Sequence, residues 1–426
     1  MSFPFLFKLK LFRKRQDRRW KRSKHFSYSK KTLAPSSFSQ TQPEIFINSI
    51  TQFEVIKKKF IHKPLQHCLL ITSNKYEHSQ QLSTIKANIE KAGFKVDFFY
   101  VDSETNLSNI QLNEMAKKYE ATNCDFLVGY GNNFIFSCVK YCHYFIQTKK
   151  IITKQITFSN DIKKPIPLVF IGSTLNINLS LNNLSIFYNQ QEKNIYQLFC
   201  KFNIPIMVVA DCSLIQQPAS SNEIAIFSLL VEAIETYISV RHFFGDVSAA
   251  RKAMQIFVKT MQTKKIDDTT MIGSFLNACA VHRSWLGFSH AISFAIANLL
   301  KQPYDTIVCW IYPYVLEYIA NKSTKIRSYF ALIADIIGFE CLSLDDISKT
   351  HECLSKLIKM SDKLIDASKL RSLMNGINEH DLKKIVNMSM LNILSLGSPI
   401  VFSKKDVLNI IHNVLNEKSS IINFDN

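Results

Sequence analysis

The chain has 426 residues, of which 47% are hydrophobic, and carries a formal net charge of +18 at pH 7. A chain of this length and apolar content can bury two cores, so two domains are expected. No apolar run reaches the ~18 residues of a membrane span, and the 10 cysteines have no framework spacing. Both observations argue against a membrane-spanning or disulfide-stabilised protein and favour a cytoplasmic one.

The positive charge is concentrated at the start of the chain. Residues 1–31 contain 12 Lys and Arg and one acidic residue, giving +11, so the remaining residues contribute 18 − 11 = +7. Residues 1–40 are therefore interpreted as a basic, disordered tail. Two alternatives stay open: residues 8–31 contact an anionic membrane or nucleic acid, or the segment is a targeting sequence.

Strands and helices are predicted to alternate between residues 41 and 212. Apolar runs predict strands at residues 43–47, 66–72, 95–101, 125–128, 167–171 and 206–210. Amphipathic stretches predict helices at residues 79–93 and 110–119, and a third that ends at about residue 148. This alternation is typical of an α/β domain with a doubly wound, Rossmann-like parallel sheet, which binds ligands at the carboxyl ends of its strands.

The region from residue 213 to 426 is predicted to be an all-α domain. Its apolar residues recur with the 3.6-residue period of helices, and strand signals vanish. Within it, His290 stands alone in a long apolar helix beside Gly287 and Ser289. Taken by itself, such a residue is a buried helix histidine.

Three segments of the helical region carry a family resemblance: EAIETYIS at 232–239, LGFSHA at 286–291 and YPYVLEYIAN at 312–321. They resemble the helical domain of the iron-containing alcohol dehydrogenases, a family that includes glycerol dehydrogenases. The resemblance extends over about residues 43–416. It implies an oxidoreductase scaffold that transfers hydride between small alcohols or aldehydes and NAD(P), with a homodimer as a possible assembly.

Only part of the family's metal site matches. The family binds one divalent metal through an aspartate, a histidine four residues later and two further histidines. The corresponding positions hold Ser228, Glu232, His290 and Tyr304, and another family histidine is Phe294 here. The resemblance implies a divergent member with Glu232 and His290 as remaining Fe or Zn ligands. Ser228 and Tyr304 occupy replaced positions, and Tyr304 is a possible proton donor.

The nucleotide-binding loops are also altered. The family holds its dinucleotide with a Gly-Gly-Gly-Ser loop, because glycine lets backbone N–H groups approach the pyrophosphate. Here that loop is Gly-Tyr-Gly-Asn at residues 129–132, and a second loop at residues 172–178 has Asn176 and Asn178 in place of glycines. The residues implied to bind NAD(P) are Gly129, Gly131, Asn132, Ser173 and Thr174.

Other histidines allow two interpretations each. Cys138, Cys142 and His143 lie close together on one predicted helix, where a buried helix face is favoured over a metal cluster. His282 lies about two helical turns before His290 and is either a substitute ligand or a structural histidine. The structural role is favoured, because buried polar groups are usually hydrogen-bonded.

Three functions therefore remain open from the sequence. The first is an NAD(P)-dependent alcohol dehydrogenase-like enzyme with impaired or altered catalysis. The second is a non-catalytic pseudoenzyme that serves as a binding or interaction module. The third is a folded body that the basic tail recruits to a membrane or nucleic acid. Loss of metal ligands favours the pseudoenzyme, and ancestry favours the dehydrogenase-like enzyme.

Overall fold

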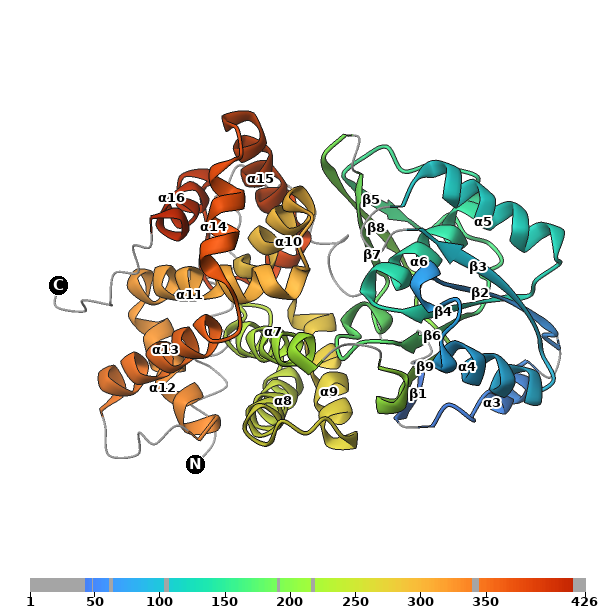
Figure 1. Ribbon diagram of the computed structural model, residues 1–426, viewed down its shortest axis with the longest axis horizontal. Helices are drawn as coiled ribbons and strands as arrows, with labels where there is room; N and C mark the ends of the chain where they lie inside the picture. Colours follow the sequence, from blue (N-terminus) through green and yellow to red (C-terminus); the bar gives the residue numbers. More distant parts are fainter. Residues whose placement is uncertain are drawn as a thin grey trace, which may run out of the picture. The chain divides into compact units, whose positions relative to one another are not determined.

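The computed structural model describes residues 43–47, 49–60, 64–102, 107–189, 192–215, 219–338 and 345–416 (Figure 1). The predicted basic tail and its proposed contacts lie outside these ranges. Within them, no helix combines the length and the hydropathy that crossing a membrane requires.

A six-stranded parallel sheet confirms the predicted α/β architecture. In spatial order its strands are β1 (Glu44–Ile47), β9 (Met207–Ala210), β6 (Leu168–Gly172), β4 (Phe126–Gly131), β2 (His67–Ser73) and β3 (Lys95–Val101). The residues of β4 and β6 are all buried, as are six of the seven in β2. Because a parallel sheet is covered on both faces, these strands read as near-continuous apolar runs.

Helices cover both faces of this sheet (Figure 1). They are α3 (Glu54–Lys59), α4 (Gln80–Lys91), α5 (Asn109–Ala121) and α6 (Asn133–Thr148). The apolar side chains of α3 and α4 share one core with Leu70 and Val128, whereas Val139 of α6 packs beside Gly129 on the opposite face. The predicted end of α4 is marked by Gly93, whose φ of +80° is the left-handed conformation that follows many helices.

The order in which consecutive strands are added to the sheet reverses between β2 and β4. The connection through α4 takes β2 to β3 at one side, and the connection through α6 takes β4 to β6 at the other. The carboxyl ends of β2 and β4 therefore lie at the topological switch point, where doubly wound sheets bind ligands. These ends are at Ser73 and Gly131.

A second, three-stranded sheet was not predicted. Its order is β5 (Ile156–Ser159), β8 (Asn194–Cys200) and β7 (Leu184–Asn189), with β7 and β8 antiparallel. Gln197 of β8 donates to Leu391 O at 3.1 Å and accepts from Ile393 N at 2.8 Å. This sheet therefore connects the α/β part to the helical part.

The second part of the described chain is helical, as predicted. Its helices are α7 (Ala219–Ile238), α8 (Phe244–Thr263), α9 (Asp268–Ser284), α10 (Phe288–Leu300), α11 (Tyr304–Lys322), α12 (Thr324–Ile336), α13 (Asp346–Asp362), α14 (Ala367–Asn375), α15 (Glu379–Leu391) and α16 (Lys404–Leu415). Residues 225–235 of α7 are all buried. This helix therefore carries its polar residues into the protein interior.

Candidate active site

One face of α7 carries buried polar side chains. Ser228, Glu232 and Glu235 follow one another at spacings of four and three residues, which places them on one side of a helix. Their exposed fractions are 0%, 1% and 2%. Glutamate is almost never buried without partners, so the partners of these carboxylates define the site.

Glu232 is held by three asparagine amides. Asn176 Nδ2 donates to its Oε1 at 2.8 Å, and Asn277 Nδ2 donates to its Oε2 at 2.7 Å. Asn178 Nδ2 also donates to Oε2. Burial raises the pKa of Glu232 to about 8, although the three amides lower it. The asparagines of the loop after β6 therefore bind the glutamate that the resemblance assigned to a metal-ligand position.

The carboxylate beside His290 is Glu235, which the sequence analysis did not select. His290 Nε2 lies 3.5 Å from Glu235 Oε2. Glu235 also accepts from Gly287 N at 2.6 Å and from Ser289 Oγ, and burial raises its pKa to about 7. A Cβ atom on Gly287 would lie 2.5 Å from Glu235 Oε1, so a larger residue at this position would displace the Glu235 carboxylate.

His290 and Tyr304 form a direct hydrogen bond. His290 Nδ1 lies 2.5 Å from Tyr304 Oη. Burial lowers the pKa of His290 to about 3, so its imidazole is neutral at physiological pH. Burial also raises the pKa of Tyr304 well above its usual value, so its phenol keeps its proton. The Phe294 ring packs against Tyr304 with centroids 6.2 Å apart.

Ser228 is associated with a different carboxylate. Burial raises the pKa of Asp305 to about 6, and the Ser228 hydroxyl lowers it. Asp305 follows Tyr304 at the start of α11. Of the four positions that the resemblance assigned to metal ligands, Glu232 binds asparagines, and His290 and Tyr304 bind each other. The Ser228 hydroxyl is buried and has no hydrogen-bond partner among the described residues.

These side chains do not fit a tightly bound metal. Both oxygens of Glu232 and one ring nitrogen of His290 already have partners, and hydroxyls of serine and neutral tyrosine are weak donors to Fe or Zn. Among the described residues, three His, Cys, Asp or Glu ligand atoms do not gather within 4.8 Å of one another at His290. A stable site for these metals needs more strong ligands.

The start of α6 offers a framework for a dinucleotide. Asn132, the N-cap of α6, is half-buried and accepts from the backbone N–H groups of Phe134 and Ile135 at 3.1 and 3.2 Å. The adjacent loop is tied to it, because Ser173 N donates to Gly131 O at 2.9 Å. The first turn of α6 therefore lies at the carboxyl end of β4, with two of its N–H groups capped by the Asn132 side chain.

Two of the predicted cofactor residues have other neighbours. Gly129 lies inside β4, and a Cβ atom there would lie 3.0 Å from Val139 and 3.1 Å from Phe170. Its glycine therefore serves the packing of α6 on the sheet, and its predicted place in the loop after the strand is corrected to a place within β4. Ser173 is fully buried, with its Oγ 3.1 Å from Tyr76 Oη.

The remaining histidine candidates are His143 and His282. His143 Nδ1 lies 2.8 Å from Asn203 Oδ1, and its Nε2 accepts from Ile166 N at 3.2 Å. Cys138 and Cys142 are buried on the same helix. These three residues therefore belong to the protein interior. His282 is half-buried, and burial lowers its pKa to about 4, but its Nδ1 has no hydrogen-bond partner among the described residues.

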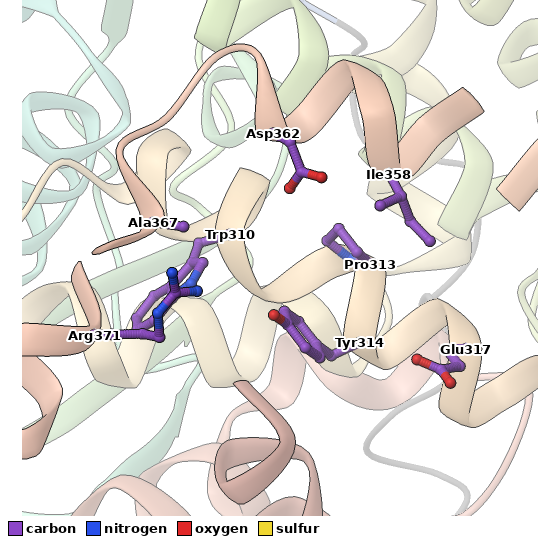
Figure 2. A pocket seen from close by; sticks show the side chains of 8 residues that line it. All are labelled: Trp310, Pro313, Tyr314, Glu317, Ile358, Asp362, Ala367 and Arg371. Atoms are coloured by element: carbon purple, nitrogen blue, oxygen red, sulfur yellow. The ribbon is translucent and has the colours of Figure 1, made fainter. Parts of the chain in front are cut away.

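A small cavity of about 80 Å³ lies elsewhere in the helical part (Figure 2). It is lined by Trp310, Pro313, Tyr314, Glu317, Ile358, Asp362, Ala367 and Arg371. None of the residues assigned to the metal or nucleotide positions lines it. This cavity is therefore separate from the candidate site.

The buried carboxylates make stability depend on pH. Folding raises the pKa of Glu232 to about 8, so its contribution is present below the unfolded pKa and is lost as pH rises to about 8. His143, His282 and His290 have lowered pKa values and oppose this trend only below about pH 6.5. We expect urea unfolding to show a loss on the order of 2 kcal/mol between pH 6.5 and 8. The Glu232→Gln variant should lose less stability over the same pH range. A free energy of unfolding that does not change with pH in the unmodified protein would contradict this prediction.

Comparison with known proteins identifies relatives over most of the chain. Family models match it as "Iron-containing alcohol dehydrogenase" over residues 47–212 and "Fe-containing alcohol dehydrogenase family, C-terminal" over residues 227–415. An NAD-dependent methanol dehydrogenase from Bacillus methanolicus is 20% identical over 356 residues, covering 81% of this chain and 92% of that protein.

Solved structures share the fold. A 1,3-propanediol oxidoreductase has a TM-score of 0.77 at 18% identity, covering 89% of this chain and 100% of that one. An alcohol dehydrogenase from Oenococcus oeni has a TM-score of 0.77 at 17% identity with the same coverage. A sulfoacetaldehyde reductase from Bifidobacterium kashiwanohense, solved with NAD+, has a TM-score of 0.71 at 16% identity, covering 89% and 99%.

Proposed function

The chain belongs to the iron-containing alcohol dehydrogenase family, and from this premise we propose that it is an NAD(P)-linked oxidoreductase that works without a tightly bound metal. Its substrates are small alcohols or aldehydes, the class on which the family acts. The resemblance and the composition also support a homodimer and a cytoplasmic location as parts of this proposal.

The single observation that carries the proposal is the His290–Tyr304 hydrogen bond of 2.5 Å. The resemblance assigns both residues to positions where the family has metal ligands, and both are neutral at physiological pH. A metal in this family polarises the alcohol oxygen. A phenol can serve the same oxygen as a general acid during aldehyde reduction.

The proposed proton path uses Tyr304, His290 and Glu235. Tyr304 Oη gives its proton to the substrate oxygen as the carbonyl carbon receives hydride. His290 Nδ1 returns a proton to Tyr304, and its Nε2 recovers one from Glu235, which lies 3.5 Å away. Glu235 suits this role, because burial brings its pKa to about 7, near the pH at which proton exchange must occur.

The dinucleotide would be held at the start of α6. A bound NAD(P) supplies or accepts the hydride. Gly131 and Asn132 would contact its pyrophosphate through their backbone, because they lie at the carboxyl end of β4 and the N-terminus of a helix. Ser173 and Thr174 form the neighbouring loop and would shape the wall of this crevice.

A second candidate function is supported by the asparagine network. Three amides occupy Glu232, and two of them come from the family's second nucleotide loop. Such a network fixes the loop against α7. This arrangement is compatible with a protein that binds no metal and catalyses no reaction. A non-catalytic binding module is therefore the alternative.

Turnover in the presence of a chelator tests both functions. We expect full-length protein to oxidise NADH or NADPH with a small aldehyde, at a rate that EDTA does not change. Binding of either dinucleotide should raise the melting temperature. A rate lost to EDTA and restored by iron would overturn metal-free catalysis. A dinucleotide-induced rise without any turnover would favour the binding module.

A further inference from the structure

A mixed set of metal-ligand types lies at the opposite end of the large sheet from the proposed dinucleotide site. His67 is the first residue of β2, Asp97 is the third residue of β3, and Cys124 precedes β4 by two residues. The three strands are neighbours in the order β4, β2, β3. Parallel strands therefore bring together, at one amino-terminal edge, residues that are 30 and 27 positions apart in the sequence.

The three side chains are close enough to share one ion. His67 Nε2 lies 2.8 Å from Asp97 Oδ2, and these atoms and Cys124 Sγ all lie within 4.8 Å of one another. Across the described ranges, this is the only group of at least three His, Cys, Asp or Glu ligands with that spacing. The His67 and Asp97 side chains are 19% and 37% exposed, which leaves access for an ion and a water.

The donor atoms match one class of metal. An imidazole nitrogen, a carboxylate oxygen and a thiolate sulfur are the three zinc ligand types, bound at about 2.0–2.3 Å. Ligand atoms around a tetrahedral zinc are separated by about 3–4 Å, so the spacing seen needs only small rotations. We propose that His67, Asp97 and Cys124 form a zinc-type divalent metal site, with its fourth position open to water.

Neighbouring groups orient two of the proposed ligands. Asp125 Oδ2 accepts from the backbone N–H of His67 at 3.1 Å and so fixes the start of β2. Thr122 Oγ1 donates to Lys118 O at 2.8 Å and lies 3.1 Å from Cys124 Sγ, so its hydroxyl oxygen faces the thiol as an acceptor and fixes the position of that side chain. Such outer contacts set ligand direction and metal affinity.

An ordinary His–Asp ion pair is the competing explanation for this geometry. The pair alone requires no cysteine, and its strength would not depend on Cys124. A metal site makes all three residues necessary and adds a sulfur–metal bond that can be observed. The two explanations therefore differ in their dependence on the thiol.

Cobalt titration of the full-length protein tests the site. Chelator-treated protein should bind one Co²⁺ per chain with a thiolate-to-cobalt charge-transfer band, and Zn²⁺ should displace it. Cys124→Ser should abolish the band, and Asp97→Asn should weaken binding at least tenfold. Cys212→Ser and His290→Ala should keep the band, because both residues lie elsewhere. Absence of the band in the unmodified protein, or its persistence in Cys124→Ser, would overturn the proposal.

Circular dichroism decides whether a lost band reflects a lost ligand. Cys124→Ser should keep the far-ultraviolet spectrum of the metal-free protein. If that variant fails to fold, Asp97→Asn carries the test, because Asp97 is partly exposed and its replacement keeps the side-chain shape. The result is independent of dehydrogenase activity, so it stands or falls separately from the proposed function.

Discussion

Replacing Glu232 with alanine is expected to destabilise the protein by about 4 kcal/mol. The change leaves three asparagine amides without their acceptor in a buried site, and each unpaired group costs about 1–3 kcal/mol. Removal of a costly buried carboxylate offsets part of this loss. The same change also disconnects the loop after β6 from α7 and α9. The measurement is the fall in the melting temperature and in the urea midpoint.

A matched control on the same helix separates this effect from the loss of any glutamate. Glu223 on α7 is 37% exposed and forms an ion pair with Lys264 at 3.2 Å. Because exposed pairs contribute about 0–1 kcal/mol, Glu223→Ala should change stability little. Equal effects of the two substitutions would show that the asparagine network does not stabilise the fold.

The second large effect is expected on turnover. Tyr304→Phe should lower kcat by about 10²–10⁴-fold, the range that general acid catalysis supplies. The phenyl ring keeps the packing against Phe294, so the melting temperature should change far less than in Glu232→Ala. Measured rates of NAD(P)H oxidation with a small aldehyde, at saturating substrate, give the comparison.

Tyr318→Phe provides the control for this substitution. Tyr318 lies on the same helix, about 21 Å further along its axis, and its hydroxyl donates to Asp406. This variant loses a hydrogen-bonded phenol without touching His290 and should keep its rate. A Tyr304→Phe variant with full activity would remove Tyr304 from the proposed proton path.

Local sequence patterns were sufficient for the large sheet but not for the small one. The strands β2, β4 and β6 are buried on both faces, and their apolar runs are visible in the sequence. The strands β7 and β8 mix aromatic residues with serine, asparagine and glutamine, because they bond to α6 and α15 as well as to each other. Such long-range partners leave no periodic signal.

The candidate site could be located from the sequence, but its contacts could not. Resemblance placed Glu232, His290 and Tyr304 in one region, and the structure brings His290 and Tyr304 together. It could not show that His290 faces Glu235, or that Glu232 is occupied by side chains more than 40 residues away. Two signals were available: the second glutamate in EAIET, and glycine at position 287.

The contacts of Glu232 also restrict how a metal site could be built at this position. A Glu232→His substitution would place a ring with at most one acceptor nitrogen before three donor amides. Placing glycine at positions 176 and 178 first would leave the buried glutamate with Asn277 alone. Each single change therefore leaves buried polar groups without partners, and a histidine ligand could be introduced here only by changing Glu232 and its asparagine partners together.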